Sequence, residues 1–278
     1  MPDTRVDHHQ GIVQRTERIS RHMVRVVVGG EGLAHFSTDG CTDHYVKLVF
    51  PYEDVDYPRP FSMKTCRETM PRRHWPRLRT YTVRAWDPDA LELTLDFVVH
   101  GDEGLAGPWA AQAAPGDELI MLGPGGGYAP DPDAAWHLLV GDESALPAIA
   151  AALEALPEGA PAHVFVEVDA PEDELKLETA ADAHITWLYR GGRPVGEPLV
   201  AAVRALEFPG GDVHAFVHGE AGFVKELRRF LRLERGIGLD RLSISGYWRL
   251  GVDDEAWRAV KSDWNRQVEA EEAAAVAS

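Results

Sequence analysis

The spacing of apolar residues changes near residue 130, and this change constrains the fold more than any other feature of the sequence. Before it, apolar and polar side chains alternate in three short segments, at 24–28, 46–50 and 91–97. Period-2 segments separated by glycine-rich turns predict the short strands of an antiparallel barrel. After it, short apolar runs interleave with segments of helical periodicity, which is typical of a parallel α/β sheet. We therefore expect a β-barrel domain over residues 1–130 and an α/β domain over residues 131–278.

The second half can be divided into elements. Strands are predicted at 137–140, 163–168, 185–189 and 213–217, and helices at about 144–156 and 223–231. A final helix is predicted over about 253–272. Its apolar stripe consists of Trp257, Val260, Trp264 and Val268. We expect this stripe to pack on the α/β domain, with binding of a partner as the alternative.

Composition excludes several classes of protein. A net charge of −17 argues against general nucleic-acid binding, because few cations are available to neutralise phosphates. No apolar run is long enough to span a bilayer, and the polar start of the chain does not resemble a secretory signal. The two cysteines, Cys41 and Cys66, form no CxxC pair, so neither a disulfide nor a zinc site is predicted. We expect a cytoplasmic monomer that binds no nucleic acid and does not insert into a membrane.

One stretch departs from the acidic composition. Between Arg59 and Arg84 there are eight Lys or Arg residues and a single acid, Glu68. Four prolines up to position 76 predict that the stretch to Leu78 is an extended loop rather than a helix or strand. Two interpretations are open: a solvated basic loop, or a positive rim around an anion-binding site.

Familiar catalytic motifs are missing. The sequence has no P-loop, GxGxxG, HExxH or GxSxG pattern. It has twelve histidines, but no pair has convincing metal-ligand spacing. No metal held by the protein itself is therefore predicted.

Two segments of the first half have the chemistry of a nucleotide cofactor site. On a strand through RTYTVR, Arg79 and Tyr81 share a face, so a guanidinium can bind a phosphate while the ring lies against a flat heterocycle. Thr82 can hydrogen-bond a ring nitrogen. Further on, DFVVHG and GLAGPWA combine small residues with the start of a helix, where backbone N–H groups can approach a diphosphate. A simple turn before a surface helix is the alternative for this second segment.

Two segments of the second half suit a nucleotide site as well. Residues 137–148 read as a buried strand, a tight turn and a helix, the arrangement that open α/β sheets use at their carboxyl ends. Residues 214–221 form a later strand of the same sheet, with 245–251 beyond it.

In order and spacing, these segments resemble the siderophore-interacting proteins. This family, also called ferric-siderophore reductases, belongs to the ferredoxin-reductase-like flavoenzymes. The resemblance extends from about residue 11 to residue 264 and rests on RTYTVR, DFVVHG with GLAGPWA, GDESALPA, HAFVHGEA and SGYWRLG. It implies a six-stranded FAD-binding barrel, then an α/β domain of the NAD(P)H-binding type with a C-terminal helix.

The resemblance also implies roles by position for two groups of residues. The residues expected to bind FAD are Arg79, Tyr81, Thr82, Asp96, Val98, His100, Gly104, Ala106, Trp109 and Ala110. Those expected around the reductant are Gly141, Asp142, Glu143 and Ser144. Glu220, near the nicotinamide, and Trp248 are the remaining catalytic candidates.

A basic clamp for the anionic siderophore is implied at Lys47 and Arg249. Lys47 would point opposite Val46 and Leu48, away from the barrel core. The chain departs from the family where Gly123-Pro124 is followed by three glycines instead of a basic residue. The clamp is then either weaker or supplied by the 59–84 loop.

The implied activity is reduction of iron(III) held in a siderophore, with FAD as cofactor and NADPH, NADH or a reduced ferredoxin as donor. An acidic protein is a poor match for an acidic ferredoxin, which favours NAD(P)H. Glu167 and Asp169 could accept ribose hydroxyls, whereas Arg190 and Arg193 could receive a 2′-phosphate. The alternatives are a general NAD(P)H:flavin or quinone oxidoreductase, and a siderophore-binding protein without turnover.

Overall fold

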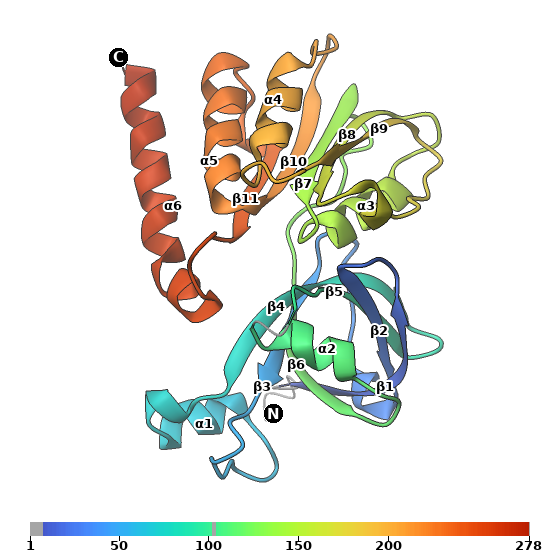
Figure 1. Ribbon diagram of the computed structural model, residues 1–278, viewed down its shortest axis with the longest axis vertical. Coiled ribbons are helices and arrows are strands. Elements are labelled where there is room, and N and C mark those ends of the chain that lie inside the picture. Colours follow the sequence, from blue (N-terminus) through green and yellow to red (C-terminus); the bar gives the residue numbers. More distant parts are fainter. Residues whose placement is uncertain (1–7, 102–103, 278) are drawn as a thin grey trace, which may run out of the picture. The chain divides into compact units, whose positions relative to one another are not determined.

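A computed structural model describes residues 8–101 and 104–277. The chain separates into two compact units, Met1–Gly126 and Gly127–Ser278. The first is built around a β-barrel and the second around a parallel sheet flanked by helices (Figure 1). Among the described residues, no helix has both the length and the apolar character that crossing a membrane requires.

The barrel of the first unit is closed and antiparallel throughout, as predicted. Its strands are β1 (His9–Arg18), β2 (Met23–Gly29), β3 (Tyr45–Phe50), β4 (Arg77–Asp87), β5 (Glu92–Val98) and β6 (Glu118–Gly125). They follow the order β1-β2-β5-β4-β3-β6 around the barrel. Every second residue of β2 points inward, so Val24, Val26 and Val28 join one apolar core. A short helix, α2 (Ala106–Gln112), buries Ala106 and Ala110 against the same core.

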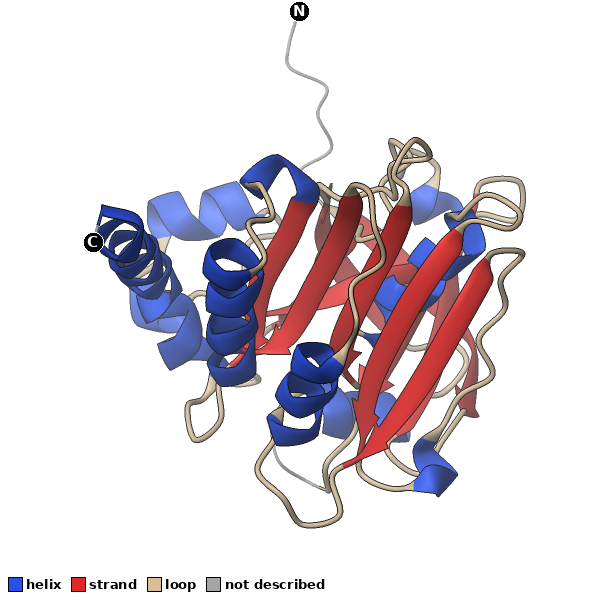
Figure 2. Cartoon of the chain, turned by 90° about the horizontal axis from the view of Figure 1, so that it is seen from above, coloured by secondary structure: helices blue, strands red, loops and turns tan. Residues whose placement is uncertain are grey.

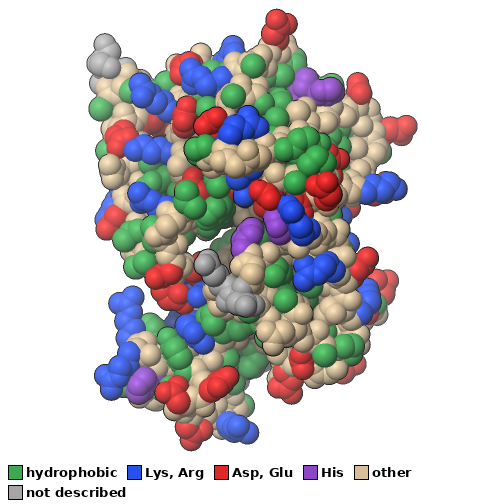
Figure 3. All heavy atoms as spheres, viewed as in Figure 1, with side chains coloured by type: hydrophobic (Ala, Val, Ile, Leu, Met, Phe, Trp, Pro, Cys, Tyr) green, Lys and Arg blue, Asp and Glu red, His purple; other side chains and the backbone are tan. Residues whose placement is uncertain are grey.

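The expectation of an extended loop from residue 59 to Leu78 is wrong. This segment contains helix α1 (Met63–Thr69) and a 3₁₀ turn (Arg72–His74) before β4 begins. The four prolines lie outside the seven-residue helix, and the hydroxyl of Ser62 accepts a hydrogen bond from the N–H of Thr65, which caps it. Met63 and Cys66 are buried, whereas the basic side chains of α1 are exposed (lower left in Figure 3). Burial of Met63 and Cys66 thus stabilises a helix in a segment whose prolines predict a loop.

The second unit contains a five-stranded sheet in the order β11-β10-β7-β8-β9, and every neighbouring pair is parallel (Figure 2). Its strands are β7 (Trp136–Asp142), β8 (Pro161–Val168), β9 (Asp182–Tyr189), β10 (Val213–Glu220) and β11 (Leu242–Trp248). The helices are α3 (Leu146–Ala155), α4 (Glu197–Ala205), α5 (Ala221–Arg229) and α6 (Asp254–Ala277). A parallel sheet aligns the carboxyl ends of its strands, and this edge carries the predicted nucleotide-site residues.

Helix α6 packs onto the second unit, as expected for its apolar stripe. Trp257 is almost fully buried, and its Nε1 donates to the carbonyl oxygen of Tyr247, 3.2 Å away. Trp264 packs against the ring of Trp257, and Val268 is buried. Val260 is the exception, because 44% of it is exposed.

Two buried histidines should make the second unit sensitive to mild acid. Burial lowers the pKa of His137 to about 4 and that of His218 to about 3. Because an unfolded histidine titrates near pH 6.5, the unfolded chain binds more protons below that value, and stability falls as the pH falls. For His137 the loss should be about 2 kcal/mol at pH 5. Urea unfolding at pH 7 and pH 5 measures it, and a His137→Leu variant should show a smaller loss. An equal loss in both proteins would contradict the assignment to His137.

Candidate functional site

Aromatic rings of the first unit form a platform that joins β4, β5 and α2. The Tyr81 ring lies 4.3 Å from that of Phe97, which is fully buried, and the Trp109 ring lies 5.5 Å from Phe97. Tyr81 and Trp109 are only half-buried. A half-exposed ring with a rigid apolar backing is suited to stacking against a flat heterocycle.

Strand register places the polar candidates on both faces of β3 and β4. Tyr81 pairs with Val46 and Arg79 with Leu48, so these side chains lie on one face, as predicted. Lys47 pairs with Thr80 on the opposite face, away from the buried Val46 and Leu48. Its predicted orientation away from the core is therefore confirmed. The half-buried Arg79 donates one hydrogen bond to the carbonyl of Leu78.

Asp96 has a partner within the barrel. Its carboxylate is 4% exposed and accepts two hydrogen bonds from Arg25 across β2 and β5, at 2.7 and 2.8 Å. This bidentate pair holds the end of β5 in place. Val98 is half-buried and His100 is exposed. Sequence reasoning missed Arg25, because a strand arginine carries no signal of the partner across the sheet.

The start of α2 leaves backbone donors available. Gly104 has φ +82° with open space where a Cβ would stand, and no described side chain caps the helix. Gly107 packs so closely that a Cβ there would meet the carbonyl of Val98 at 3.0 Å. Ala106 and Ala110 point into the core, so what this segment can offer a ligand is backbone N–H groups.

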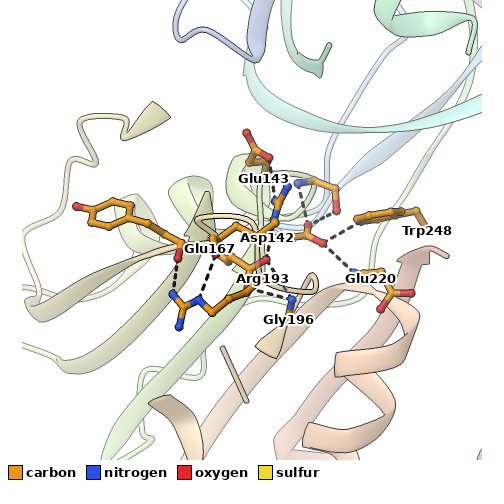
Figure 4. A network of polar contacts seen from close by, with 10 residues as sticks. Asp142, Glu143, Glu167, Arg193, Gly196, Glu220 and Trp248 are labelled. Atoms are coloured by element: carbon orange, nitrogen blue, oxygen red, sulfur yellow. Dashed lines mark hydrogen bonds and ion pairs between the residues drawn. The ribbon is translucent and has the colours of Figure 1, made fainter. Parts of the chain in front are cut away.

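In the second unit, the candidate residues at the carboxyl edge of the sheet bond to one another. Asp142, at the end of β7, is 2% exposed and accepts four hydrogen bonds (Figure 4). Its Oδ1 accepts from the N–H of Ser144 at 2.9 Å and from its hydroxyl at 2.5 Å. Its Oδ2 accepts from the N–H of Glu220 at 2.9 Å and from Nε1 of Trp248 at 2.8 Å. One carboxylate therefore ties together the ends of β7, β10 and β11.

Glu220 extends this network toward Arg249. Its Oε2 accepts from the N–H groups of Gly222 and Phe223 and so caps α5. Its Oε1 accepts from the N–H of Leu250 at 3.2 Å, which fastens the chain just beyond Arg249. Gly141 is required by packing, since a Cβ there would lie 2.5 Å from Cβ of Ala145. Asp142 and Glu220 thus shape the site through their neighbours.

A second network lies on the β8 side of the same edge. Glu167 is fully buried and accepts from the N–H of Gly196 with both oxygens, at 3.1 and 3.0 Å. Arg190 bridges Glu167 and Glu143, at 3.1 and 3.3 Å. Burial raises the pKa of Glu167 even though these partners favour its charged form.

These contacts alter the expected roles of the β8 and β9 residues. The interpretation of Glu167 as a ribose acceptor is wrong, because its side chain is fully buried and serves the protein's own backbone. Arg190 is held by two carboxylates, and the exposed Arg193 donates to the carbonyls of Tyr189 and Arg190. The half-buried Asp169 remains a predicted ribose partner.

Comparison with known proteins identifies the family. Residues 12–128 match the model of the siderophore-interacting FAD-binding domain, and residues 134–251 match that of the siderophore-interacting protein. The chain is 36% identical to the ferric vibriobactin reductase ViuB of Vibrio cholerae, over 87% of this chain and 90% of that protein. The chain belongs to the siderophore-interacting protein family.

Two further relatives support this membership. The NADPH-dependent ferric-chelate reductase of Escherichia coli is 35% identical over 85% of this chain and 91% of its own length. A crystal structure of a siderophore utilization protein from T. fusca superposes with a TM-score of 0.77 at 38% identity, covering 89% of this chain and 94% of that one. The resemblance inferred from five motifs is thus confirmed over most of the chain.

The first unit has the groups that FAD, the cofactor of this family's first domain, requires. Tyr81 provides a backed aromatic surface for the ring system, and the uncapped start of α2 provides N–H donors for the diphosphate. Arg79 adds a half-buried cation. The residues present therefore fit the cofactor.

Proposed function

We propose that this protein is an FAD-dependent reductase of ferric siderophores that takes its electrons from NAD(P)H. The observation that carries the proposal is similarity to two proteins named for this chemistry, together with side chains in the first unit that suit FAD. A bound flavin accepts a hydride from a nicotinamide and can pass electrons singly to iron. Siderophore oxygens hold iron(III) tightly and iron(II) much less so, which makes reduction a route to release.

In this proposal the chain binds and positions the reactants and supplies no general acid or base. Arg79, Tyr81 and Thr82 would hold FAD by its diphosphate and ring, with Asp96, Val98 and His100 lining it. The backbone of the segment containing Gly104, Ala106, Trp109 and Ala110 would bind the diphosphate. Lys47 and Arg249 would attract the anionic ferric complex, since both are cations in a strongly acidic protein.

The nucleotide would bind at the carboxyl edge of the parallel sheet, beside Gly141, Glu143 and Ser144. Asp142 and Glu220 would act indirectly, by holding Trp248 and the chain around Arg249 in place. The name of the E. coli relative favours NADPH. The ion pairs of Arg190 favour NADH, because this arginine must leave two carboxylates to bind a 2′-phosphate.

Anaerobic stopped-flow absorbance at the flavin bands tests the proposal. NADPH or NADH is added first, followed by a ferric siderophore with a ferrous trap. We expect bleaching by one of the nucleotides, then reoxidation together with formation of the ferrous complex. The nucleotide that bleaches faster identifies the donor.

Three other outcomes would contradict the proposal as stated. A protein that cannot take up FAD would be a siderophore-binding protein without turnover. Flavin that neither nucleotide reduces would point to a protein donor such as ferredoxin. Reoxidation by quinones in preference to ferric siderophores would indicate a general NAD(P)H:quinone oxidoreductase.

A further inference from the structure

Three side chains with different metal-ligating groups converge in the loop before β3. They are the carboxylate of Asp39, the thiol of Cys41 and the imidazole of His44, and their ligating atoms all lie within 4.8 Å of one another. Ligand atoms around a tetrahedral zinc ion are roughly 3.3–3.9 Å apart, so only small movements would bring the three atoms onto one ion. Thiolate and imidazole together favour borderline divalent cations such as Zn²⁺ over Mg²⁺ or Ca²⁺.

The orientation of His44 is that of a metal ligand whose ring is fixed by a hydrogen bond to the backbone. The ring is buried, and Nδ1 lies 3.1 Å from the carbonyl oxygen of Gly125. Because a carbonyl can only accept, Nδ1 carries the hydrogen. Nε2 then accepts a hydrogen bond from the backbone N–H of Asp39 at 3.1 Å and lies 3.0 Å from Oδ1 of the same residue. An ion must therefore displace this N–H from Nε2 when it binds. Metal-binding histidines commonly donate one ring N–H to a backbone carbonyl in this way while the other nitrogen binds the ion.

The surroundings hold the cluster together and leave one side accessible. Gly126 packs against it so closely that a Cβ there would lie 2.8 Å from Nδ1 of His44 and 3.2 Å from Cβ of Cys41. On the other side, 80% of the Asp39 side chain is exposed, and Cys41 is only half-buried. An ion therefore has a route from solvent to the carboxylate of Asp39 and the thiol of Cys41, with His44 behind them.

We propose that Asp39, Cys41 and His44 bind a first-row divalent cation, Zn²⁺ or Fe²⁺, with water in the fourth position. As the metal–sulfur bond forms, the thiol proton is released to solvent, and no oxidation state changes. The site stands on these three residues and does not depend on the reductase function. If that function holds, the ferrous ion released from the siderophore is available to this site.

Zinc binding to the oxidised, FAD-loaded protein tests the site without any turnover. After dialysis against a chelator, calorimetry should show one equivalent of Zn²⁺ bound. X-ray absorption at the zinc edge should show one sulfur neighbour at about 2.3 Å. Cys41→Ala and Asp39→Asn should each weaken binding at least about 10-fold. Cys66→Ala, at the other cysteine of the chain, is the matched control and should bind as the wild type does.

Asp39→Asn also separates loss of a ligand from loss of folding, because it changes an exposed side chain with little effect on packing. Failure to bind zinc stoichiometrically, a spectrum with only nitrogen and oxygen neighbours, or equal binding by Cys41→Ala would overturn the proposal. Anaerobic Fe²⁺ added to the zinc-loaded protein separates the two occupants. Displacement at moderate excess assigns the site to ferrous iron, and retention assigns it to zinc, which binds N/O/S ligands more tightly.

Discussion

Replacing Asp142 with asparagine should lower the free energy of unfolding by about 2–4 kcal/mol, because the carboxylate accepts four hydrogen bonds while buried. An asparagine amide accepts with one end only. Its NH₂ group must then face either the N–H groups of Glu220 and Trp248 or the N–H and hydroxyl groups of Ser144. Urea denaturation of the two proteins at pH 7 measures the difference.

A double-mutant cycle with Trp248→Phe isolates the contact that reaches β11. Phenylalanine removes the indole N–H donor. If the asparagine NH₂ group faces Glu220 and Trp248, it then opposes one N–H instead of two. The double variant should therefore be more stable than the sum of the two single changes predicts. We expect a coupling of about 1–2 kcal/mol between residues that share a hydrogen bond. Strict additivity would show that the NH₂ group faces Ser144 instead, with the asparagine oxygen still accepting from Trp248.

The same variants connect this network with the proposed activity. If Asp142 is a positioning residue for Trp248 and Arg249, its loss should raise KM for the ferric siderophore more than it lowers kcat. The rate of flavin bleaching by nucleotide serves as an internal comparison. A uniform loss of folded protein would reduce the apparent kcat and leave KM unchanged, which separates a positioning role from a purely structural one.

Gly196→Ala should be among the most destabilising single substitutions in the second unit, at about 3 kcal/mol or more. Gly196 has φ +84°, and a Cβ there would lie 2.3 Å from Cβ of Phe223, a buried residue of α5. The new methyl group must displace either α5 or the N–H that donates to Glu167. Thermal and urea unfolding measure the effect.

Gly192→Ala is the matched control in the same loop. Gly192 has φ +81°, nearly the same backbone conformation, but a Cβ there would have no atom within 4 Å. The substitution should cost only the backbone strain, about 1–2 kcal/mol. Equal effects of the two substitutions would mean that contact with Phe223 is not the cause. A Phe223→Gly background, which removes Cβ of Phe223 as well as its ring, should reduce the cost of Gly196→Ala if it is.

The sequence alone was sufficient for the architecture and for the family. Barrel strands and the α/β alternation are local signals, because the period of apolar residues reflects which face of each element is buried. The motifs carry their own chemistry in short segments, so Tyr81 and Arg79 could be assigned to one strand face before any fold was known. Helix α1 was missed because the prolines around it predict a loop, whereas the helix is capped by Ser62 and its Met63 clusters with Val49 and Leu78 of the barrel strands.

Only the tertiary structure decided what the polar residues contact. Asp142 receives two of its four hydrogen bonds from residues 78 and 106 positions away, because a parallel sheet brings the carboxyl ends of distant strands together. Glu167, a candidate ligand in the sequence, is a buried partner of Gly196, which lies 29 positions away at the start of α4. Asp39, Cys41 and His44 have no recognisable metal-binding spacing, and it is the folded loop that brings them together. A carboxylate that binds a ligand and one that binds its own backbone look alike in sequence, since the difference lies in donors that folding supplies.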